Sequence, residues 1–303
     1  MADSIDIPFI DATSATGDEL VAGLRHSSSV FLSGLPWLAS SLDSLMRSSR
    51  DFFDLPETEK VAYQWDGVPP WQGWQPLYQG GTGTTSAAPM ERFEVALPNP
   101  DAFDSRDIWA ATFRQWPAEP ATMMPSWAAY YLKMRELSIR LVTQIAESLE
   151  LPAADLPAWT TDQHANLCVN HYLAQDAAPT SGQERNRAHT DIGGITLLWG
   201  ENTTGGLHVQ KPDTGEWVPV EFPPDTVLLQ AGDLLHLWTN GLIPKNNHRV
   251  VNPSEWPAPE RYSVVYFHHP DLETWVAPVT KDAADGVTAR DHVLARQTSA
   301  YST

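Results

Sequence analysis

The sequence is poor in cysteine and in basic residues. Cys168 is the single cysteine among 303 residues, which excludes an intrachain disulfide and fits a reducing compartment, so we expect the protein in the cytoplasm. With 19 basic and 38 acidic residues, the formal net charge is -19. A field of that sign repels nucleic-acid phosphates and anionic lipids, so we expect neither nucleic acid nor a membrane surface as a partner.

Long hydrophobic runs are also missing. The opening residues MADSIDIPFID contain no basic segment followed by an apolar one, so we expect no secretory signal. No stretch reaches the roughly 18 apolar residues of a membrane span. Because 42% of the residues are hydrophobic, the chain can still fill a large core. We expect a globular protein, and no obligatory protein partner is evident in the sequence.

The first half of the chain mixes strand-like and helix-like segments. Residues 1–118 alternate between the two and predict a mixed α/β part. In residues 119–152 apolar side chains recur every three or four positions, which predicts a long helix that backs a sheet. The segment Trp65–Trp74 is rich in glycine, proline and tryptophan without any period, which predicts a binding loop or a lid.

Short apolar or alternating segments separated by turns fill residues 160–270, among them NLCVNHYL, GITLLWG, LLHLWTNG and RYSVVYFHHP. This spacing predicts the strands of a β-sandwich or barrel. Residues 285–303 predict a closing helix, which is a second candidate lid. Without an internal repeat or a linker, residues 1–303 predict one domain, mainly β with helices: a double-stranded β-helix (jelly roll) core flanked by helices.

His189 and Asp191 stand two positions apart before the apolar segment ITLLW. In an extended strand, side chains at i and i+2 point to the same face, so both can reach one metal ion. His248 follows later, where a returning strand can supply a third ligand. The same spacing recurs at His269 and Asp271, but that pair comes after the last predicted strand, and we place it in a C-terminal loop.

Two histidines and one carboxylate form a facial triad, which suits non-haem iron(II) and O₂. Zinc with the same ligands would hold one water for hydrolysis. Arg261 and Ser263 form a second i, i+2 pair, and a buried arginine near a metal needs an anion such as a carboxylate. With iron(II), Asp191, the two carboxylates of 2-oxoglutarate and Arg261, the buried charges cancel, which favours iron over zinc.

Each of these residues also has a purely structural interpretation. His189 and Asp191 could form a surface turn, and His248 could be a core histidine with satisfied hydrogen bonds. Arg261 could pair with a structural carboxylate. The four residues together, on strands that are otherwise apolar, favour the metal site over these alternatives.

The chain resembles the isopenicillin N synthase-like family of iron(II)/2-oxoglutarate-dependent oxygenases. The similar segments are IDIPFID, FFDLPETEK, GWQPL and ERFEVAL, and most specifically HTDIGGITLLWGENTTGGLHVQ, GDLLHLWTNG, HRVV and RYSVVYF. The resemblance implies that His189, Asp191 and His248 bind iron. It also implies that Arg261 and Ser263 bind the C5 carboxylate of 2-oxoglutarate.

Further residues follow from the same resemblance or from their position near the motif. Asn170 and Tyr172 match family positions that line the cosubstrate pocket, and their i, i+2 spacing puts them on one face. Arg185 and Arg187 directly precede the iron ligands and are candidates for a substrate carboxylate, although loop arginines are more often solvated. Trp74, in the tryptophan-rich segment, is a further candidate substrate contact.

The resemblance implies a dioxygenase that uses iron(II), 2-oxoglutarate and O₂. Such an enzyme would oxidise, and most simply hydroxylate, an unactivated C–H bond of a small molecule, with succinate and CO₂ as coproducts. Family members with the same Arg-x-Ser pair include oxidases that cyclise or desaturate without 2-oxoglutarate, which leaves that alternative open. A non-enzymatic β-sandwich binding module is a third alternative, which would need neither iron nor an intact triad.

Overall fold

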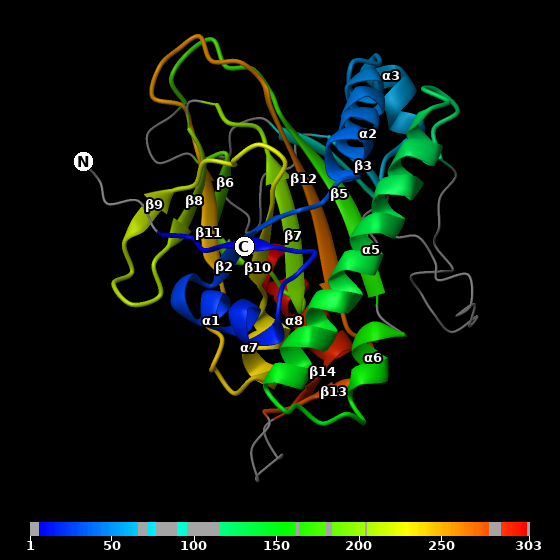
Figure 1. The fold of residues 1–303 in the computed structure, drawn as a ribbon. Helices are drawn as coiled ribbons and strands as arrows, with labels where there is room; N and C mark the ends of the chain where they lie inside the picture. The colour runs from blue at the N-terminus through cyan, green and yellow to red at the C-terminus, as the bar shows by residue number, and fades with distance from the viewer. Residues whose placement is uncertain are drawn as a thin grey trace.

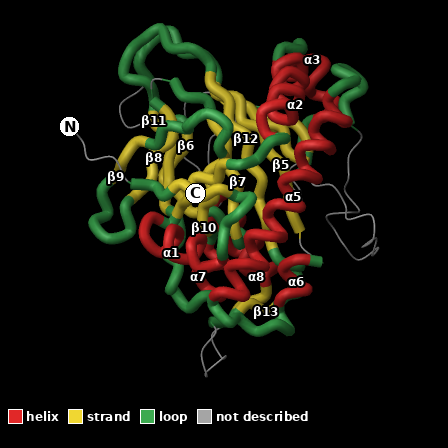
Figure 2. Tube along the Cα trace, viewed as in Figure 1, coloured by secondary structure: helices red, strands yellow, loops and turns green. Residues whose placement is uncertain are grey.

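Two β-sheets lie face to face at the centre of the protein (Figure 1). The structure is a computed structural model that describes residues 6–65, 72–76, 90–95, 116–161, 164–179, 184–203, 205–278 and 286–301. The larger sheet has eight strands in the order β1-β2-β10-β7-β12-β5-β4-β3, and the smaller has four in the order β6-β11-β8-β9. Helices cover the outer face of the larger sheet (Figure 2). The expected jelly-roll core flanked by helices is confirmed.

The elements have the following bounds. The larger sheet contains β1 (Phe9–Asp11), β2 (Ser29–Ser33), β3 (Gly73–Gln75), β4 (Met90–Val95), β5 (His164–Tyr172), β7 (Ile195–Gly200), β10 (Val227–Ala231) and β12 (Arg261–His269). The smaller contains β6 (Asn186–Thr190), β8 (Gly206–Gln210), β9 (Trp217–Pro219) and β11 (Asn247–Val251), and a separate pair is formed by β13 (Trp275–Val276) and β14 (Val287–Thr288). The helices are α1 (Gly17–Ser27), α2 (Leu38–Phe53), α3 (Glu57–Lys60), the 3₁₀ helix η1 (Val61–Tyr63), α5 (Met123–Ser148), α6 (Leu156–Thr160), α7 (Asp233–Trp238) and α8 (Ala289–Tyr301).

The central strands divide their side chains between two environments. On β12, Tyr262 and Val264 belong to the main core that the strands share with helices α1, α2 and α5. Val265 belongs to a second core between the two sheets, where it packs with side chains of β8 and β9. Because alternate residues of a strand face opposite sides, Arg261 and Ser263 also point between the sheets. The space between the sheets therefore collects the polar residues of the predicted site.

Helix α5 is the main support of the larger sheet. The helix expected over residues 119–152 occupies Met123–Ser148, and its buried side chains recur every three or four residues. It starts late because the chain turns at Pro120, whose carbonyl accepts the amide of Met123. Helices α1 and α2 pack against α5 (Figure 1). Among the described helices, none is both long and apolar enough to cross a membrane.

Two expectations for individual elements are wrong. The segment LLHLWTNG was expected as a strand, but Asp233–Trp238 form helix α7, in which Trp238 stacks on Trp159 with 4.3 Å between ring centres. A short apolar run has no period that separates a strand from a buried helical turn. His269 is the last residue of β12 rather than part of a C-terminal loop. It stays in the strand because it continues the pairing with β5 as far as His164.

Trp74 belongs to the sheet instead of a lid. It lies on β3, is 2% exposed in the main core, and its indole N–H donates to Glu91 Oε2 at 2.7 Å. The lid expectation is therefore wrong for this residue, because its ring is needed to fill the core and the polar atom of that ring is already bonded. Residues 66–71 of the same segment lie outside the described residues.

Glu91 is the centre of a buried cluster of polar side chains. Its carboxylate accepts hydrogen bonds from Lys60 Nζ at 2.8 Å and from Trp74, and it lies 3.0 Å from His171 Nδ1. Burial alone would raise the pKa of Glu91, but the hydrogen bonds with His171, Lys60 and Trp74 outweigh it and hold that pKa below its ordinary value. The carboxylate therefore stays ionised and holds β3, β4 and β5 to α3.

Glu91→Gln should destabilise the fold at neutral pH by about 3 kcal/mol, because the buried Lys60 would lose its counter-ion. Because the pKa of Glu91 is lower in the folded than in the unfolded protein, its carboxylate stabilises the fold fully above the ordinary pKa of 4.5. This stabilisation is lost as the pH falls through the pKa of the folded state. The difference in the free energy of unfolding between wild type and Glu91→Gln, measured by urea unfolding, should thus be full at pH 7 and shrink below pH 4.5.

Glu216→Gln, which removes an exposed partner of Lys211, is the control and should lower the free energy of unfolding by less than about 1 kcal/mol. Equal losses in the two variants would contradict the role of Glu91.

Candidate metal centre and anion pocket

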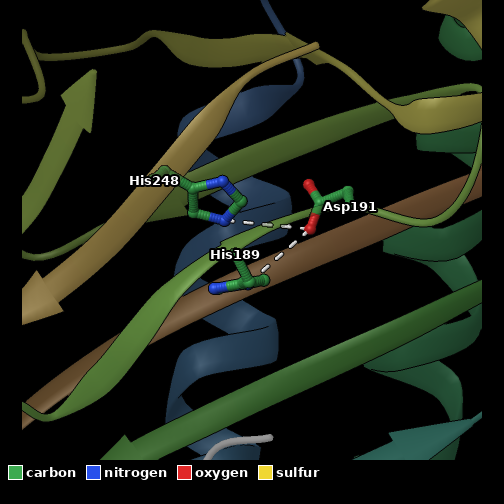
Figure 3. Close-up of side chains that lie close together, drawn as sticks. All are labelled: His189, Asp191 and His248. Carbon is green, nitrogen blue, oxygen red and sulfur yellow. Dashed lines mark ion pairs between the residues drawn. The ribbon is translucent and has the colours of Figure 1, made fainter. Parts of the chain in front are cut away.

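Three side chains from β6, from the residue after it and from β11 converge on one point (Figure 3). His189 lies on β6, Asp191 follows that strand directly, and His248 lies opposite His189 on the antiparallel strand β11. Asp191 Oδ1 is 3.9 Å from His189 Nε2 and 3.8 Å from His248 Nε2. These separations are too long for hydrogen bonds and leave space for an ion among the three atoms. The structure thus brings the three predicted ligands together.

The backbone orients both imidazole rings. His189 Nδ1 lies 2.7 Å from the carbonyl oxygen of Arg187, and His248 Nδ1 lies 3.3 Å from that of Asn246. An Nδ1–H that donates to a carbonyl leaves the lone pair of Nε2 free for a metal. Burial and the neighbouring His248 lower the pKa of His189, which keeps this ring neutral and able to coordinate.

The surroundings of the Asp191 carboxylate show whether a cation fits the site. Its side chain is 6% exposed, and its Oδ2 has no hydrogen-bond partner among the described residues. A buried carboxylate oxygen without a donor is costly unless a cation compensates it. A divalent metal beside the two imidazoles would compensate this carboxylate, so the donor set fits a metal ion.

The C-terminal helix supports the ligand strand from outside. Arg296 on α8 donates to the carbonyl oxygen and to the hydroxyl of Thr190, the residue between His189 and Asp191, at 3.2 and 2.9 Å. Asp233 on α7 accepts the Thr190 hydroxyl at 2.8 Å and pairs with Arg296 at 3.2 Å. The amide of Asp233 also donates to the carbonyl oxygen of Asp191 at 2.8 Å. Sequence reasoning missed these contacts because no motif joins such distant segments.

The other predicted residues meet on the paired strands β5 and β12. Arg261 lies opposite Tyr172, and Ser263 lies opposite Asn170, whose amide donates to the Ser263 hydroxyl at 3.1 Å. The Arg261 guanidinium is 5.2 Å from the centre of the Tyr172 ring. Its Nε donates to the carbonyl oxygen of Glu201 at 3.0 Å. We call the cluster of Arg261, Ser263, Tyr172 and Asn170 the anion pocket.

The anion pocket has an unfilled donor. Arg261 is 2% exposed, and its Nη1 has no hydrogen-bond partner among the described residues. Burial lowers the pKa of Arg261, but an arginine remains charged at neutral pH. A buried guanidinium with a free N–H group needs an anion, and a carboxylate matches its planar geometry. The residues present therefore fit a carboxylate ligand.

The two arginines before the metal ligands have different surroundings. Arg187 is half-buried on β6. Arg185 is 1% exposed and its guanidinium is 5.9 Å from the Tyr172 ring centre, so the solvated alternative is wrong for this residue. Its Nη2 donates to the carbonyl oxygen of Pro259, so Arg185 lies between the segment before β12 and the ring of Tyr172.

Known proteins share these sequence segments and this fold. Residues 164–270 match the model of the 2OG-Fe(II) oxygenase superfamily. The chain is 31% identical over 281 residues to validamycin A dioxygenase of Streptomyces hygroscopicus subsp. limoneus, which covers 88% of this chain and 75% of that protein. It is 33% identical over 153 residues to a proline hydroxylase of Petromyces alliaceus, which covers 48% of each chain. A full-length Neurospora crassa protein, crystallised with alpha-KG and thymine, has a similar fold, with a TM-score of 0.82, 22% identity and 99% of both chains covered.

Proposed function

Because this chain belongs to the 2OG-Fe(II) oxygenase superfamily, we propose that it hydroxylates an unactivated C–H bond of a small molecule, while 2-oxoglutarate is converted to succinate and CO₂. Family membership makes the protein an oxidoreductase that uses iron(II), 2-oxoglutarate and O₂, and it removes the alternative of a non-enzymatic binding module. The observation that carries the proposal is the convergence of His189 Nε2 and His248 Nε2 on Oδ1 of the buried Asp191.

These three side chains would hold iron(II) through two imidazole nitrogens and one carboxylate oxygen. Iron(II) and 2-oxoglutarate, when bound, supply the activation of O₂ and the oxidising power for the C–H bond. The protein contributes the fixed geometry of the ligands. The carbonyl oxygens of Arg187 and Asn246 hold the imidazole rings, and the amide of Asp233 holds the backbone of Asp191.

The anion pocket would bind the C5 carboxylate of 2-oxoglutarate. Arg261 offers its free Nη1, and the hydroxyls of Ser263 and Tyr172 can donate to the same group. Asn170 holds the Ser263 hydroxyl in place through its amide. The charges of iron(II), Asp191, 2-oxoglutarate and Arg261 then cancel inside the protein, which makes their joint burial tolerable. This balance supports 2-oxoglutarate as the ligand of the pocket.

Hydroxylation of a small molecule is the finer part of the proposal. The proline hydroxylase and validamycin A dioxygenase among the relatives, and the thymine in the complex of the Neurospora crassa protein, support a small organic substrate. Cyclisation or desaturation would use the same protein groups, but no described residue favours them. The cytoplasm as the compartment remains a prediction from the single cysteine.

Anaerobic titration of the metal-free protein with iron(II) and then 2-oxoglutarate tests the cofactor sites. We expect a visible metal-to-ligand charge-transfer band that appears only when both are present. Admission of O₂ with a substrate should release one succinate for each hydroxylated product, measured by mass spectrometry. Iron binding without the band, or product without succinate, would contradict the proposed reaction.

Gly200 offers a test of the anion pocket that leaves its residues unchanged. A Cβ atom at Gly200 would lie 2.5 Å from Arg261 Nη2, so Gly200→Ala should displace the guanidinium. We expect the dissociation constant of 2-oxoglutarate to rise about tenfold, as overpacking of a buried site implies, while iron(II) affinity stays the same. Gly215→Asn, in an exposed turn with a φ of 71° that asparagine tolerates, is the control. An unchanged constant in Gly200→Ala would contradict binding through Arg261.

A further inference from the structure

Arg185 is a buried arginine without a counter-ion among the described residues. Its side chain is 1% exposed, and no carboxylate in the described part of the chain forms an ion pair with it. Nη2 donates to the carbonyl oxygen of Pro259 at 3.3 Å, which is a long hydrogen bond. Nε and Nη1, which carry three of the five N–H donors of the group, have no partner there. Such a group is costly to bury unless an anion binds to it.

Arg185 lies beside the anion pocket and close in sequence to the predicted metal ligands. It lies four residues before His189 on the same segment, and its guanidinium approaches the Tyr172 ring. Arg261 approaches the same ring, at 5.2 Å from the centre. Burial and the nearby positive charge of Arg261 lower the pKa of Arg185 to about 10, so it is still protonated at neutral pH. Two positive charges therefore face the space around Tyr172.

In the site loaded with iron(II) and 2-oxoglutarate, the positive charge of Arg185 has no matching negative charge among the described residues. Iron(II), Asp191, 2-oxoglutarate and Arg261 already sum to zero. Arg185 adds one positive charge to this buried assembly, and no described carboxylate removes it. The missing negative charge is therefore expected from a ligand other than the cosubstrate.

We propose that Arg185 binds a carboxylate of the substrate, so that the enzyme acts on a small organic acid. This inference rests on the proposed function and names its substrate class. Arg185 thereby orients the acid through charge-assisted hydrogen bonds from Nε and Nη1, beside the pocket that holds 2-oxoglutarate. A neutral or cationic analogue would leave the guanidinium buried and unpaired, and would bind more weakly.

The same guanidinium could instead join Arg261 on the far carboxylate of 2-oxoglutarate. The two sources of the carboxylate differ in a measurable way. If Arg185 binds 2-oxoglutarate, its substitution lowers the affinity for 2-oxoglutarate in the absence of any other acid. If Arg185 binds the substrate, its substitution leaves that affinity unchanged.

The test uses the full chain loaded anaerobically with iron(II) and saturating 2-oxoglutarate. Acetate and acetamide, which have the same shape and differ in charge, are the probes, and their binding is followed by saturation-transfer difference NMR. The variants are Arg185→Gln and Arg185→Lys, and Arg47→Gln is the control for the loss of one positive charge at an exposed site. The charge-transfer band with 2-oxoglutarate is titrated in each variant, which tests the iron and cosubstrate sites separately from the inference.

We expect the wild type and Arg47→Gln to bind acetate at least about tenfold more tightly than acetamide. Arg185→Gln should lose this preference, and Arg185→Lys should keep part of it, while the band and the 2-oxoglutarate constant stay within about twofold of wild type. An at least tenfold weaker 2-oxoglutarate complex in Arg185→Gln would overturn the inference and assign Arg185 to the cosubstrate. Equal binding of acetate and acetamide by the wild type would overturn it without any variant, even if Arg185→Gln does not fold.

Discussion

Asp191→Asn should leave a folded protein that has lost iron(II) and, with it, turnover of 2-oxoglutarate. The loss of iron affinity should exceed the roughly 10- to 100-fold that changes around metal ligands cost, because the variant removes the anionic member of the triad. In the metal-free protein, the change removes a buried charge whose Oδ2 has no partner among the described residues, so the melting temperature should not fall. Iron(II) should raise the melting temperature of the wild type but not of the variant. Iron titration and thermal unfolding measure both effects.

Asp225→Asn is the matched control for this prediction. Asp225 is an exposed turn residue with a φ of 56°, a conformation that asparagine adopts readily. It should keep the iron affinity, the charge-transfer band and the turnover of the wild type. If Asp191→Asn still binds iron(II) with wild-type affinity, Asp191 is not a ligand and the proposed metal centre is wrong.

Arg261→Gln is expected to weaken 2-oxoglutarate binding by at least about 30-fold, since loss of one partner of a buried charged pair costs about 2 kcal/mol or more. The effect should appear in the KM for 2-oxoglutarate, whereas kcat at saturation and the iron(II) affinity should change much less. A glutamine lacks the charge, and Arg261→Lys should recover only part of the affinity because its ammonium cannot form the planar double contact. Titration of the charge-transfer band and steady-state kinetics give both quantities.

The exposed Arg47→Gln, which changes the net charge equally, should have no effect on the KM for 2-oxoglutarate. An unchanged KM in Arg261→Gln would mean that Arg261 has a structural role in holding Glu201. Reduced stability with unchanged affinity would support that structural role.

The convergence of the three candidate metal ligands was predictable from the sequence because it follows from strand periodicity. His189 and Asp191 share a face through their i, i+2 spacing, and the antiparallel pairing of β6 with β11 puts His248 opposite His189. The same rule joins Arg261 and Ser263 on β12. The pairing of these two with Tyr172 and Asn170 was expected only from the family resemblance, and the register of β5 and β12 supplies it directly.

Contacts between distant segments were not predictable. Nothing in the sequence indicates that Arg296 bonds to Thr190 or that Gly200 makes room for the guanidinium of Arg261. The burial of Arg185 was likewise hidden, because a loop position suggests solvent until the neighbouring strands are placed. The helix at Asp233–Trp238 was missed because a run of six residues is too short to have a usable period.

The alternation of β12 makes the proposed cosubstrate pocket depend on strand register. A shift of one residue would turn Arg261 toward the helices and Tyr262 toward the pocket, so a misregistered chain loses the pocket together with its core. The central strands therefore tolerate no shift of register. Under the proposed function, binding of 2-oxoglutarate would also report that β12 has its native register. Strand β6 is at the edge of its sheet, and the segment before it carries Arg185. Under the proposal for Arg185, sequence changes in that segment would alter the substrate preference without shifting the register of β12.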